Sequence, residues 1–280
     1  MNDRVLVTGG TGKTGRLVAE QLAVRGIEAR IATRHPSAAD QVRFDWQDAT
    51  TYGAALDGVT SVYLVAPTDR TEQLAVMLPF LERSLEQASG RLVLLSASSL
   101  DEADPMMGEV HAWLNDHASC WTVLRPSWFM QNFTTQHLSS IVDEGRIYSA
   151  TEDGRVPFID AADIAAVAVE VLIDPKFASG EHVLTGPEAI TYDEAAHAIT
   201  QAVGRPVRHC RLSTEELAAR YAEFGIPQHY ASILAGMDEA IAHGAEDRTS
   251  MAVQQIAGRP ANTFAGFLST QCAVFSPNGQ

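Results

Sequence analysis

A glycine-rich turn that follows an apolar run near the start of the chain most constrains what this sequence can fold into. Residues 5–7 have the character of a β-strand, and Gly9, Gly12 and Gly15 follow in the pattern G-x-x-G-x-x-G. Glycine lets the chain turn sharply and lets backbone N–H groups approach a pyrophosphate without an intervening Cβ. Residues 14–25 then have the pattern of a helix, whose N-terminus favours an anion. This order of strand, turn and helix predicts a dinucleotide-binding site.

Two other interpretations of these residues are weaker. Gly12-Lys-Thr14 resembles the end of a Walker A loop, but that motif needs a glycine five positions before Gly12, where the chain has Val7. The second alternative is a glycine-rich turn that binds nothing, and the glycines alone would not exclude it. The flanking strand and helix supply the context that supports a dinucleotide site.

Short apolar runs alternate with helical patterns through the first half of the chain. The expected strands after the first are residues 29–33, 42–44, 61–65, 92–95 and 121–124, with helices between them that include residues 74–85 and 107–117. Such alternation indicates a parallel sheet joined by right-handed crossovers. We therefore predict an α/β fold, a Rossmann-like doubly wound parallel sheet with a small α/β C-terminal substrate-binding portion.

The second half of the chain is expected to be interwoven with the first. It begins with an aromatic segment, and a strand at 156–159 and helices around 164–172 and 230–241 follow. Two capping boxes, Thr191-x-x-Glu194 and Ser213-x-x-Glu216, predict helix starts because hydroxyl and carboxylate reciprocally satisfy exposed N–H groups. We expect an NAD(P)-binding domain over residues 1–128 and a substrate-binding portion over 129–280 that partly returns to the sheet.

Charge and cysteine content limit the classes of partner. Twenty basic and thirty-five acidic residues give the 280-residue chain a net charge of −15, which should repel nucleic acid and anionic membranes. Three scattered cysteines argue against a disulfide framework or a structural zinc site, and no metal is expected. The first strand begins too early to leave room for a signal peptide. We expect a cytoplasmic protein that is a monomer or a weak homo-oligomer.

The tip of the second expected strand bears on the choice of cofactor. The NAD form of this motif places an acidic residue about twenty positions on, where it binds the ribose 2′-hydroxyl. Here the tip reads Thr33-Arg34-His35. Arg34, helped by Lys13 or His35, would attract a 2′-phosphate, so we expect NADPH, with NADH as the second option. The alternative is that Arg34 is a solvated loop residue.

Other cofactor contacts are expected beyond the carboxyl ends of the strands, where parallel sheets bind ligands. The Asp45 carboxylate would receive the adenine amino group, or else cap a turn. Ala66 and Pro67 would lie beside the pyrophosphate and the nicotinamide ribose. The predicted cofactor-binding residues are Gly9, Thr11, Gly12, Lys13, Thr14, Gly15, Thr33, Arg34, Asp45, Trp46, Ala66, Pro67, Ser96 and Pro126.

Two further groups are candidates for substrate contacts. Ser96, Ser98 and Ser99 follow the fifth expected strand, where they could hydrogen-bond a substrate oxygen or simply form a turn. Aromatic residues gather around the sixth strand, where a flat polycyclic ligand would stack, although helical aromatics are often core residues. The predicted substrate pocket comprises Trp113, Trp128, Phe129, Met130, Asn132 and Phe133. We expect the partner to be a hydrophobic small molecule.

The chain resembles the NmrA-like branch of the atypical short-chain dehydrogenases/reductases, and within it the ergot-alkaloid-type reductases and bacterial natural-product relatives. The resemblance covers nearly the whole length. The residues that carry it are Val7-Thr-Gly-Gly-Thr-Gly-Lys-Thr-Gly15, Ala32-Thr-Arg34, Leu124-Arg-Pro-Ser-Trp-Phe-Met-Gln-Asn132 and Val156-Pro-Phe-Ile-Asp-Ala-Ala-Asp163. It implies a Rossmann domain, NADP(H), and a small C-terminal portion that closes over a hydrophobic substrate. Family members include reductases of carbonyls, iminium ions, quinones and dyes, and redox-sensing regulators.

The chain departs from the main branch of that superfamily at its catalytic pair. The main branch uses Tyr-x-x-x-Lys, in which the tyrosine protonates the carbonyl oxygen and the lysine lowers its pKa. The corresponding positions here fall near Gly108 and Ala112, which cannot move a proton. His111 is the nearby group suited to proton transfer at neutral pH, or else a surface or packing histidine. The candidate catalytic residues are therefore Ser96, Ser98 and His111.

These features together predict an NADPH-dependent reductase that works without the Tyr and Lys pair. It would transfer hydride to a ketone or other activated electrophile of a hydrophobic polycyclic natural product, chiefly by proximity and orientation. The alternatives are a non-catalytic NAD(P)-sensing regulatory protein, a quinone or iminium reductase, and an isomerase or epimerase that uses the nucleotide transiently.

Overall fold

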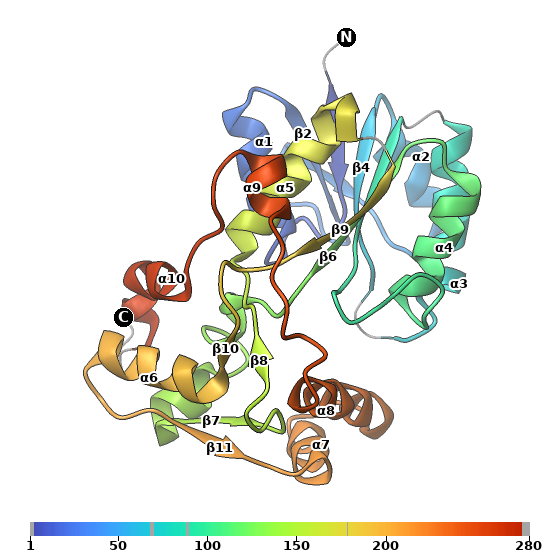
Figure 1. Cartoon of the computed structure of the whole chain (residues 1–280). Helices are drawn as coiled ribbons and strands as arrows, with labels where there is room; N and C mark the ends of the chain where they lie inside the picture. Colours follow the sequence, from blue (N-terminus) through green and yellow to red (C-terminus); the bar gives the residue numbers. More distant parts are fainter. Residues whose placement is uncertain (1–2, 68–69, 88–89, 178, 276–280) are drawn as a thin grey trace. The chain divides into compact units, whose positions relative to one another are not determined.

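Seven parallel strands form one sheet in the order β3-β2-β1-β4-β5-β6-β9 (Figure 1). The computed structural model describes residues 3–67, 70–87, 90–177 and 179–275. The strand order reverses between β1 and β4, which makes this the topological switch point where open α/β sheets bind ligands. The strands are β1 (Arg4–Val7), β2 (Glu28–Thr33), β3 (Gln41–Arg43), β4 (Ser61–Val65), β5 (Arg91–Leu95), β6 (Trp121–Pro126) and β9 (Gly180–Leu184).

Helices cover both faces of the sheet. α1, α5 and α9 pack together on one face, and α3 and α4 lie on the other (Figure 1). This arrangement confirms the predicted doubly wound fold. The helices are α1 (Gly15–Val24), α2 (Tyr52–Leu56), α3 (Gln73–Glu86), α4 (Met107–His117), α5 (Ala161–Ile173) and α9 (Ala252–Ala257), with short turns η1 (Ala49–Thr51) and η4 (Pro175–Phe177).

β1, β4 and β5 are apolar after their first residue because helices bury both faces of these central strands. Leu6 of β1, Leu64 of β4 and Leu92 of β5 are fully buried in a core that also contains Phe80 of α3. Continuous apolar runs of this kind explain why the strands could be placed from the sequence alone.

All of these elements belong to one of two compact units in the chain. Unit 1 consists of Met1–Pro126, Ala161–Leu184 and Ala252–Arg259, and unit 2 consists of Ser127–Asp160, Thr185–Met251 and Pro260–Gln280. Unit 1 begins with the segment predicted to bind the nucleotide. It also takes up α5, β9 and α9 from the second half of the chain.

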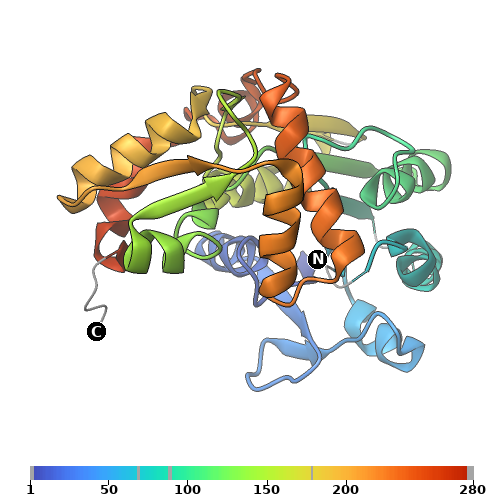
Figure 2. The ribbon, with the colours of Figure 1, turned by 90° about the horizontal axis from the view of Figure 1, so that it is seen from below.

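Unit 2 contains two small sheets and several helices. β7 pairs in parallel with β11, and β8 pairs with β10 in the antiparallel direction. α7 and α8 pack side by side, and both are orange in Figure 2. The elements are η2 (Met130–Asn132), the π-helical turn η3 (Ser140–Glu144), β7 (Arg146–Ser149), β8 (Arg155–Val156), β10 (Ile190–Thr191), α6 (Tyr192–Val203), β11 (Arg208–Arg211), α7 (Thr214–Glu223), α8 (Gln228–Ala242), α10 (Phe264–Gln271) and η5 (Cys272–Phe275).

Four aromatic rings form the centre of the unit 2 core. The ring centroid of Phe133 lies 5.0 Å from that of Phe158 and 5.0 Å from that of Phe264. Phe158 in turn lies 5.3 Å from Tyr192 in an edge-to-face arrangement. Such edge contacts add to the stabilisation that burial of the rings already provides.

Local sequence signals place most elements correctly, with one correction. Both predicted capping boxes are present, at the starts of α6 and α7, and α4 has its predicted bounds. The expected strand at 156–159 was wrong in its length, because β8 ends at Val156. Pro157 has no N–H to donate to a ladder, and the backbone of Ile159 instead bridges to Phe129.

Candidate functional site

Thr8 joins β1 to β4 just beyond the end of β1. Its hydroxyl donates to the Tyr63 carbonyl oxygen at 3.0 Å and accepts from the Val65 N–H at 2.7 Å. The Thr8 side chain is fully buried, so both bonds lie in a low-dielectric environment that strengthens them. The glycine-rich turn therefore leaves the sheet from a fixed position at the switch point.

The glycine-rich turn has no room for side chains at its first and last glycines. Gly9 has a φ of +60°, and a Cβ there would lie 2.9 Å from Val65 Cβ. A Cβ on Gly15 would lie only 2.4 Å from the Gly9 carbonyl oxygen. The Gly12 N–H closes the turn by donating to that same oxygen at 2.9 Å. Glycine is thus a steric requirement of this conformation.

Gly10 is also sterically constrained, although the motif did not single it out. A Cβ at this position would lie 2.7 Å from Cγ2 of Ile31 in β2. The constraint comes from a residue about twenty positions away in the neighbouring strand, so spacing within the turn could not reveal it.

The start of α1 suits an anionic group. α1 begins at Gly15, and in the described part of the chain its N-cap residue Thr14 makes no side-chain capping bond. N–H groups in a first helical turn need acceptors, and the helix dipole favours negative charge there. The glycine-rich turn forms a cradle at the N-terminus of α1 that a Cβ would fill. This cradle fits the pyrophosphate of NAD(P)H. The residues that would hold it are Gly9, Thr11, Gly12, Lys13, Thr14 and Gly15.

Two of the three cations expected to select NADPH, Arg34 and His35, lie just beyond the carboxyl end of β2. Thr33 is the last residue of this strand, and its hydroxyl accepts from the His35 N–H at 3.3 Å. Arg34 and His35 are exposed just beyond it, and Lys13 is exposed in the glycine-rich turn. Recognition of a 2′-phosphate by Arg34 stays a prediction.

Replacing Arg34 by alanine is expected to raise the apparent KM for NADPH at least about tenfold, with little change for NADH. The reason is that a charge-assisted hydrogen bond to phosphate contributes about 1.5–3 kcal/mol, and NADH has no such phosphate. Steady-state kinetics with both cofactors measure this difference. Arg83→Ala on α3, which removes an exposed guanidinium that pairs with Glu86, is the matched control. Equal changes for the two cofactors would contradict the assignment.

The structure shows local roles for Asp45 and Trp46. The Asp45 carboxylate accepts from the Gln47 N–H at 2.9 Å, which is the turn-capping alternative. Trp46 packs against Phe44 and Phe80, with ring centroids 4.8 and 5.3 Å apart. These contacts explain why both residues suit this loop without a ligand, and their contact with adenine stays a prediction.

Ser96 and Ser98 continue the pairing with β6 beyond the end of β5. The Ser96 N–H donates to the Leu124 carbonyl oxygen at 2.8 Å, and the Ser98 N–H donates to that of Pro126 at 2.9 Å. Both serines are buried, whereas Ser99 is exposed. The structure thus brings Ser96, Ser98 and Pro126 together at the carboxyl ends of β5 and β6, where ligands of such sheets bind. Ala66 and Pro67 follow the adjacent strand β4 in the same way.

Gly108, near which the position of the catalytic tyrosine is expected, has no room for a side chain. A Cβ on Gly108 of α4 would lie 2.4 Å from the Asp101 carbonyl oxygen and 2.9 Å from Asp104 Cβ. Distances this short are excluded for real Cβ atoms, so a larger side chain would displace the loop that precedes α4. The packing of this segment therefore requires glycine at position 108, and its correspondence to the tyrosine of Tyr-x-x-x-Lys stays a prediction.

His111 lies in the interface between α4 and the sheet. Its side chain is only 3% exposed, and its ring lies 5.3 Å from the ring of Trp121, the first residue of β6. Nδ1 is 4.0 Å from Glu181 Oε2. Burial lowers the pKa of His111, so the ring is neutral at neutral pH and has no extra proton to give. These contacts favour the packing alternative over the proton-donor hypothesis.

The residues predicted for the substrate pocket are divided between the two units. Trp113 belongs to unit 1, where it stacks on His117 with ring centroids 4.7 Å apart. Met130 and Phe133 are buried in the aromatic core of unit 2 because α10 and the segment around Phe158 cover them. The other predicted pocket residues, Trp128, Phe129 and Asn132, are half-buried in unit 2.

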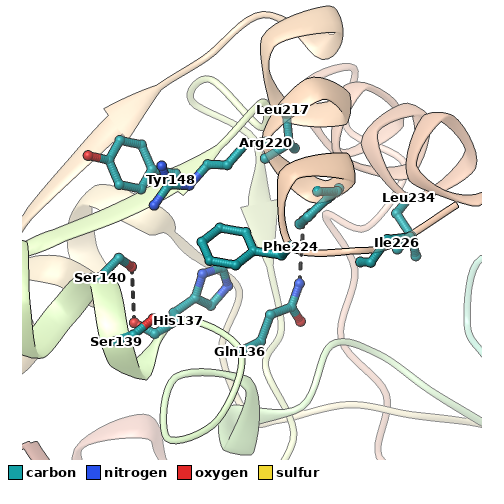
Figure 3. Close-up of a pocket in the computed structure, with 11 residues that line it drawn as sticks. Gln136, His137, Ser139, Ser140, Tyr148, Leu217, Arg220, Phe224, Ile226 and Leu234 are labelled. Atoms are coloured by element: carbon teal, nitrogen blue, oxygen red, sulfur yellow. Dashed lines mark hydrogen bonds between the residues drawn. The ribbon is translucent and has the colours of Figure 1, made fainter. Parts of the chain in front are cut away.

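A cavity of about 400 Å³ lies within unit 2 and was missed from the sequence (Figure 3). Its walls come from the segment around η3, from β7 and from the α7–α8 pair. The available signal was an apolar stripe along α7 and its C-cap residue, with Leu217, Tyr221 and Phe224, but the residues that it packs against are distant in sequence. The lining residues are Gln136, His137, Ser139, Ser140, Tyr148, Leu217, Arg220, Tyr221, Phe224, Ile226 and Leu234.

A serine, a histidine and an aspartate also line up in unit 2. His209 Nε2 lies 2.7 Å from Ser149 Oγ, and His209 Nδ1 lies 3.5 Å from Asp193 Oδ2. Ser149 is only 1% exposed and the His209 side chain is fully buried, so a substrate cannot reach the hydroxyl. This arrangement tethers β7 to β11 and is not a hydrolytic triad.

The described residues contain neither a membrane-spanning helix nor a cluster of metal ligands. No helix among them is both long and apolar enough to cross a membrane. Within the same ranges, no three His, Cys, Asp or Glu side chains are grouped closely enough to hold a metal ion. Cys120, Cys210 and Cys272 are free thiols.

Comparisons with known proteins agree with the geometry of unit 1. A family model described as NAD(P)H-binding matches residues 9–175, and one described as the NmrA-like family matches residues 114–264. The chain is 41% identical to "Uncharacterized oxidoreductase YesF" of Bacillus subtilis (strain 168), over 97% of this chain and 96% of the relative. It is 37% identical to agroclavine dehydrogenase of Claviceps fusiformis, over 95% of this chain and 96% of that enzyme.

Solved structures show the same fold at lower identity. The NADPH complex of an NADPH-dependent quinone oxidoreductase from Escherichia coli matches with a TM-score of 0.81 and 22% identity, over 95% of this chain and 99% of the other. The NADP(H) complex of a Citrobacter triphenylmethane reductase has a TM-score of 0.81 and 19% identity, over 96% and 99%.

Proposed function

The chain belongs to the NmrA-like family and is an oxidoreductase with an NAD(P)H-binding domain, and from this premise we propose that it reduces an activated electrophile of a hydrophobic polycyclic natural product with NADPH. The electrophile is a ketone or an iminium carbon. NADPH, when bound, supplies the hydride. The glycine cradle binds its pyrophosphate, and Arg34 selects its 2′-phosphate.

The closed position at Gly108 carries the proposal. Because backbone occupies the space of the usual tyrosine and Ala112 replaces the usual lysine, α4 supplies no proton to a carbonyl oxygen. Substrates that need no strong protein acid fit this chain best. An iminium carbon carries its own positive charge, and a ketone next to a phenol on the same molecule is already hydrogen-bonded. Ser96 and Ser98 would orient the substrate oxygen or nitrogen, so catalysis is chiefly positioning.

The named relatives support a polycyclic substrate and a setting in secondary metabolism. Agroclavine dehydrogenases from Claviceps species are 34–37% identical to this chain, and a festuclavine dehydrogenase of Aspergillus fumigatus is 34% identical. An acidic surface suits a freely diffusing enzyme but does not choose a substrate. The packing of α4 thus supports an activated electrophile, and the named relatives support a polycyclic scaffold.

Loss of NADPH absorbance with purified protein is the direct test. The panel consists of cyclic iminium ions, polycyclic ketones with a neighbouring phenol, the same ketones without the phenol, and quinones. We expect turnover of the iminium ions or the phenolic ketones, and at least about tenfold slower reduction of the ketones that lack the phenol. Ser96→Ala and Ser98→Ala should each lower kcat less than about tenfold, because neither hydroxyl is the sole proton source.

Two outcomes would contradict the proposal. Tight NADPH binding without turnover of any compound would favour a regulatory protein that senses NAD(P). Conversion of a substrate without net NADPH consumption would favour an isomerase or epimerase. A preference for quinones over all other compounds would keep the reductase but reassign its substrate class.

A further inference from the structure

The cavity in unit 2 is lined mainly by apolar side chains and contains an arginine but no carboxylate among its described lining residues. Three aromatic side chains and three aliphatic ones supply most of its wall, namely Tyr148, Tyr221, Phe224, Leu217, Ile226 and Leu234. Arg220 is the one formally charged residue among the eleven described lining residues when the histidine is neutral, and none of them is a carboxylate. A volume of about 400 Å³ lies in the range of small-molecule sites. The lining therefore favours a flat apolar ligand with negative charge.

Arg220 is held at the cavity by aromatic rings. Its guanidinium carbon lies 3.9 Å from the ring centroid of Tyr148 and 5.4 Å from that of Phe224 (Figure 3). Stacking of this kind fixes the plane of the guanidinium while its edge can still donate hydrogen bonds. Its ion pair with Glu144 is long, 3.5 Å, and Glu144 is 42% exposed, so solvent weakens this pair. An anion in the cavity can compete for the same guanidinium.

Phe224 indicates that the ligand is aromatic. It is 69% exposed, although it is a large apolar side chain at the edge of a cavity. It lies at the end of α7 and is followed by Gly225, whose φ of +85° lets the chain turn away sharply. A planar ring against Phe224 would bury apolar surface that now faces water and would form a stacked pair.

The opposite wall provides polar contacts. Gln136 Nε2 donates to the Tyr221 hydroxyl at 3.4 Å. Burial raises the pKa of Tyr221, so its hydroxyl stays protonated and neutral at physiological pH. Ser139 and Ser140 also line this side. Ser140 Oγ donates to the His137 carbonyl oxygen at 3.1 Å, whereas the Tyr221 hydroxyl keeps a proton that it can donate to an oxyanion in the cavity that Arg220 also lines.

We propose that the unit 2 cavity binds a flat aromatic anion, such as a ring system that carries a carboxylate, phenolate or sulfonate. Its rings stack beside Phe224 and Tyr148, and its anionic group binds Arg220. The site uses unit 2 residues alone and does not depend on the reductase proposal. The ligand is either a substrate of the enzyme or an effector that binds at a separate place.

Isothermal titration of the full chain, without cofactor, tests the site with two matched probes. Naphthalenesulfonate combines two fused rings with a permanent negative charge, and naphthylmethylammonium has the same rings with a positive charge. We expect the sulfonate to bind at least about tenfold more tightly than the ammonium. Equal affinity for the two probes, or no binding of the sulfonate, would overturn the proposal.

Two variants and two controls locate the binding. Arg220→Gln should weaken naphthalenesulfonate binding at least about tenfold, and Phe224→Ala about three- to tenfold. Phe224 is mostly exposed, so its removal should leave folding intact even if Arg220→Gln lowers stability. Arg208→Gln and Met251→Ala remove an exposed arginine and a 59% exposed apolar side chain of unit 2 outside the cavity. Equal losses in the controls would contradict the assignment.

Inhibition kinetics distinguish the two sources of the ligand. If naphthalenesulfonate competes with the electrophile in the NADPH oxidation assay, the cavity is the substrate site. If it binds but changes kcat alone, the cavity is an effector site. If the protein binds the sulfonate but reduces no compound of the panel, the cavity proposal stands and the reductase proposal fails. If it reduces a compound but does not bind the sulfonate, the reductase proposal stands and the cavity proposal fails.

Discussion

Replacing Gly15 by alanine is expected to weaken NADPH binding by at least about 100-fold, the largest effect we expect from a single methyl group in this chain. The added Cβ would lie 2.4 Å from the Gly9 carbonyl oxygen and 2.8 Å from Gly10 Cα. Both neighbours are backbone atoms, so no side chain can rotate away to make room. The turn must open, and the Gly12 N–H then loses its bond to Gly9. Overpacking of this kind also costs about 1–3 kcal/mol of stability.

Gly53→Ala is the matched control for this change. Gly53 lies in α2 of the same unit, and a Cβ there would meet nothing within 4 Å. Alanine is the better helix former, so this variant should be more stable by about 0.5–1 kcal/mol and bind NADPH normally. Isothermal titration with NADPH and thermal unfolding separate the two effects. Unchanged NADPH affinity in a folded Gly15→Ala protein would rule out the turn as the pyrophosphate site.

The fold could be predicted because its signals are local. β4 and β5 are apolar after their first residue, since helices bury both of their faces. α6 and α7 each begin with a capping box that spans only four residues. The glycine-rich turn is equally local. Its spacing predicts a nucleotide-binding turn although the steric reasons, such as the contact of Gly15 with Gly9, appear only in three dimensions.

The candidate substrate region could not be predicted in the same way because it depends on which side chains become core. Phe133 and Trp128 look equivalent in the sequence, but Phe133 is fully buried against Phe158 and Phe264 whereas Trp128 is half-buried. The unit 2 cavity combines Gln136 with residues of α7 about eighty positions later. No local window contains both, so periodicity on α7 predicts an amphipathic helix but not what its apolar face encloses.

His111 shows that a position close to the expected catalytic residues in the sequence does not determine the role of a side chain. It stands beside Ala112, at the position where a proton donor would be sought. The helix nevertheless turns its ring onto Trp121, where burial lowers its pKa. Residue type and spacing predicted a titratable group near the site, and the phase of α4 places its ring against β6, which favours the packing alternative.

Asp238→Asn is expected to stabilise the protein at neutral pH by about 1–3 kcal/mol. Asp238 of α8 is 4% exposed, and burial raises the pKa of its carboxyl from 3.8 to about 6, although the Ala150 N–H donates to it at 3.1 Å. Burial and the nearby Asp238 charge also raise the pKa of Tyr192 and of Tyr221. Ionising Asp238 therefore costs more in the folded chain than in the unfolded one, and asparagine avoids this cost while its amide oxygen can still accept from Ala150.

The raised pKa of Asp238 determines how the stabilisation by Asp238→Asn changes with pH. The folded-state pKa lies above the unfolded one, so the contribution of Asp238 to stability is fully present below about pH 4 and is lost as the pH rises to about 6. Urea unfolding should show the full advantage of Asp238→Asn near pH 7.5, about half of it near pH 5 and little of it near pH 4. Glu239→Gln, which neutralises the adjacent exposed carboxylate on α8, should change stability by less than about 0.5 kcal/mol. A destabilised Asp238→Asn protein at neutral pH would instead mean that the bond from Ala150 to the ionised carboxylate outweighs the cost of its burial.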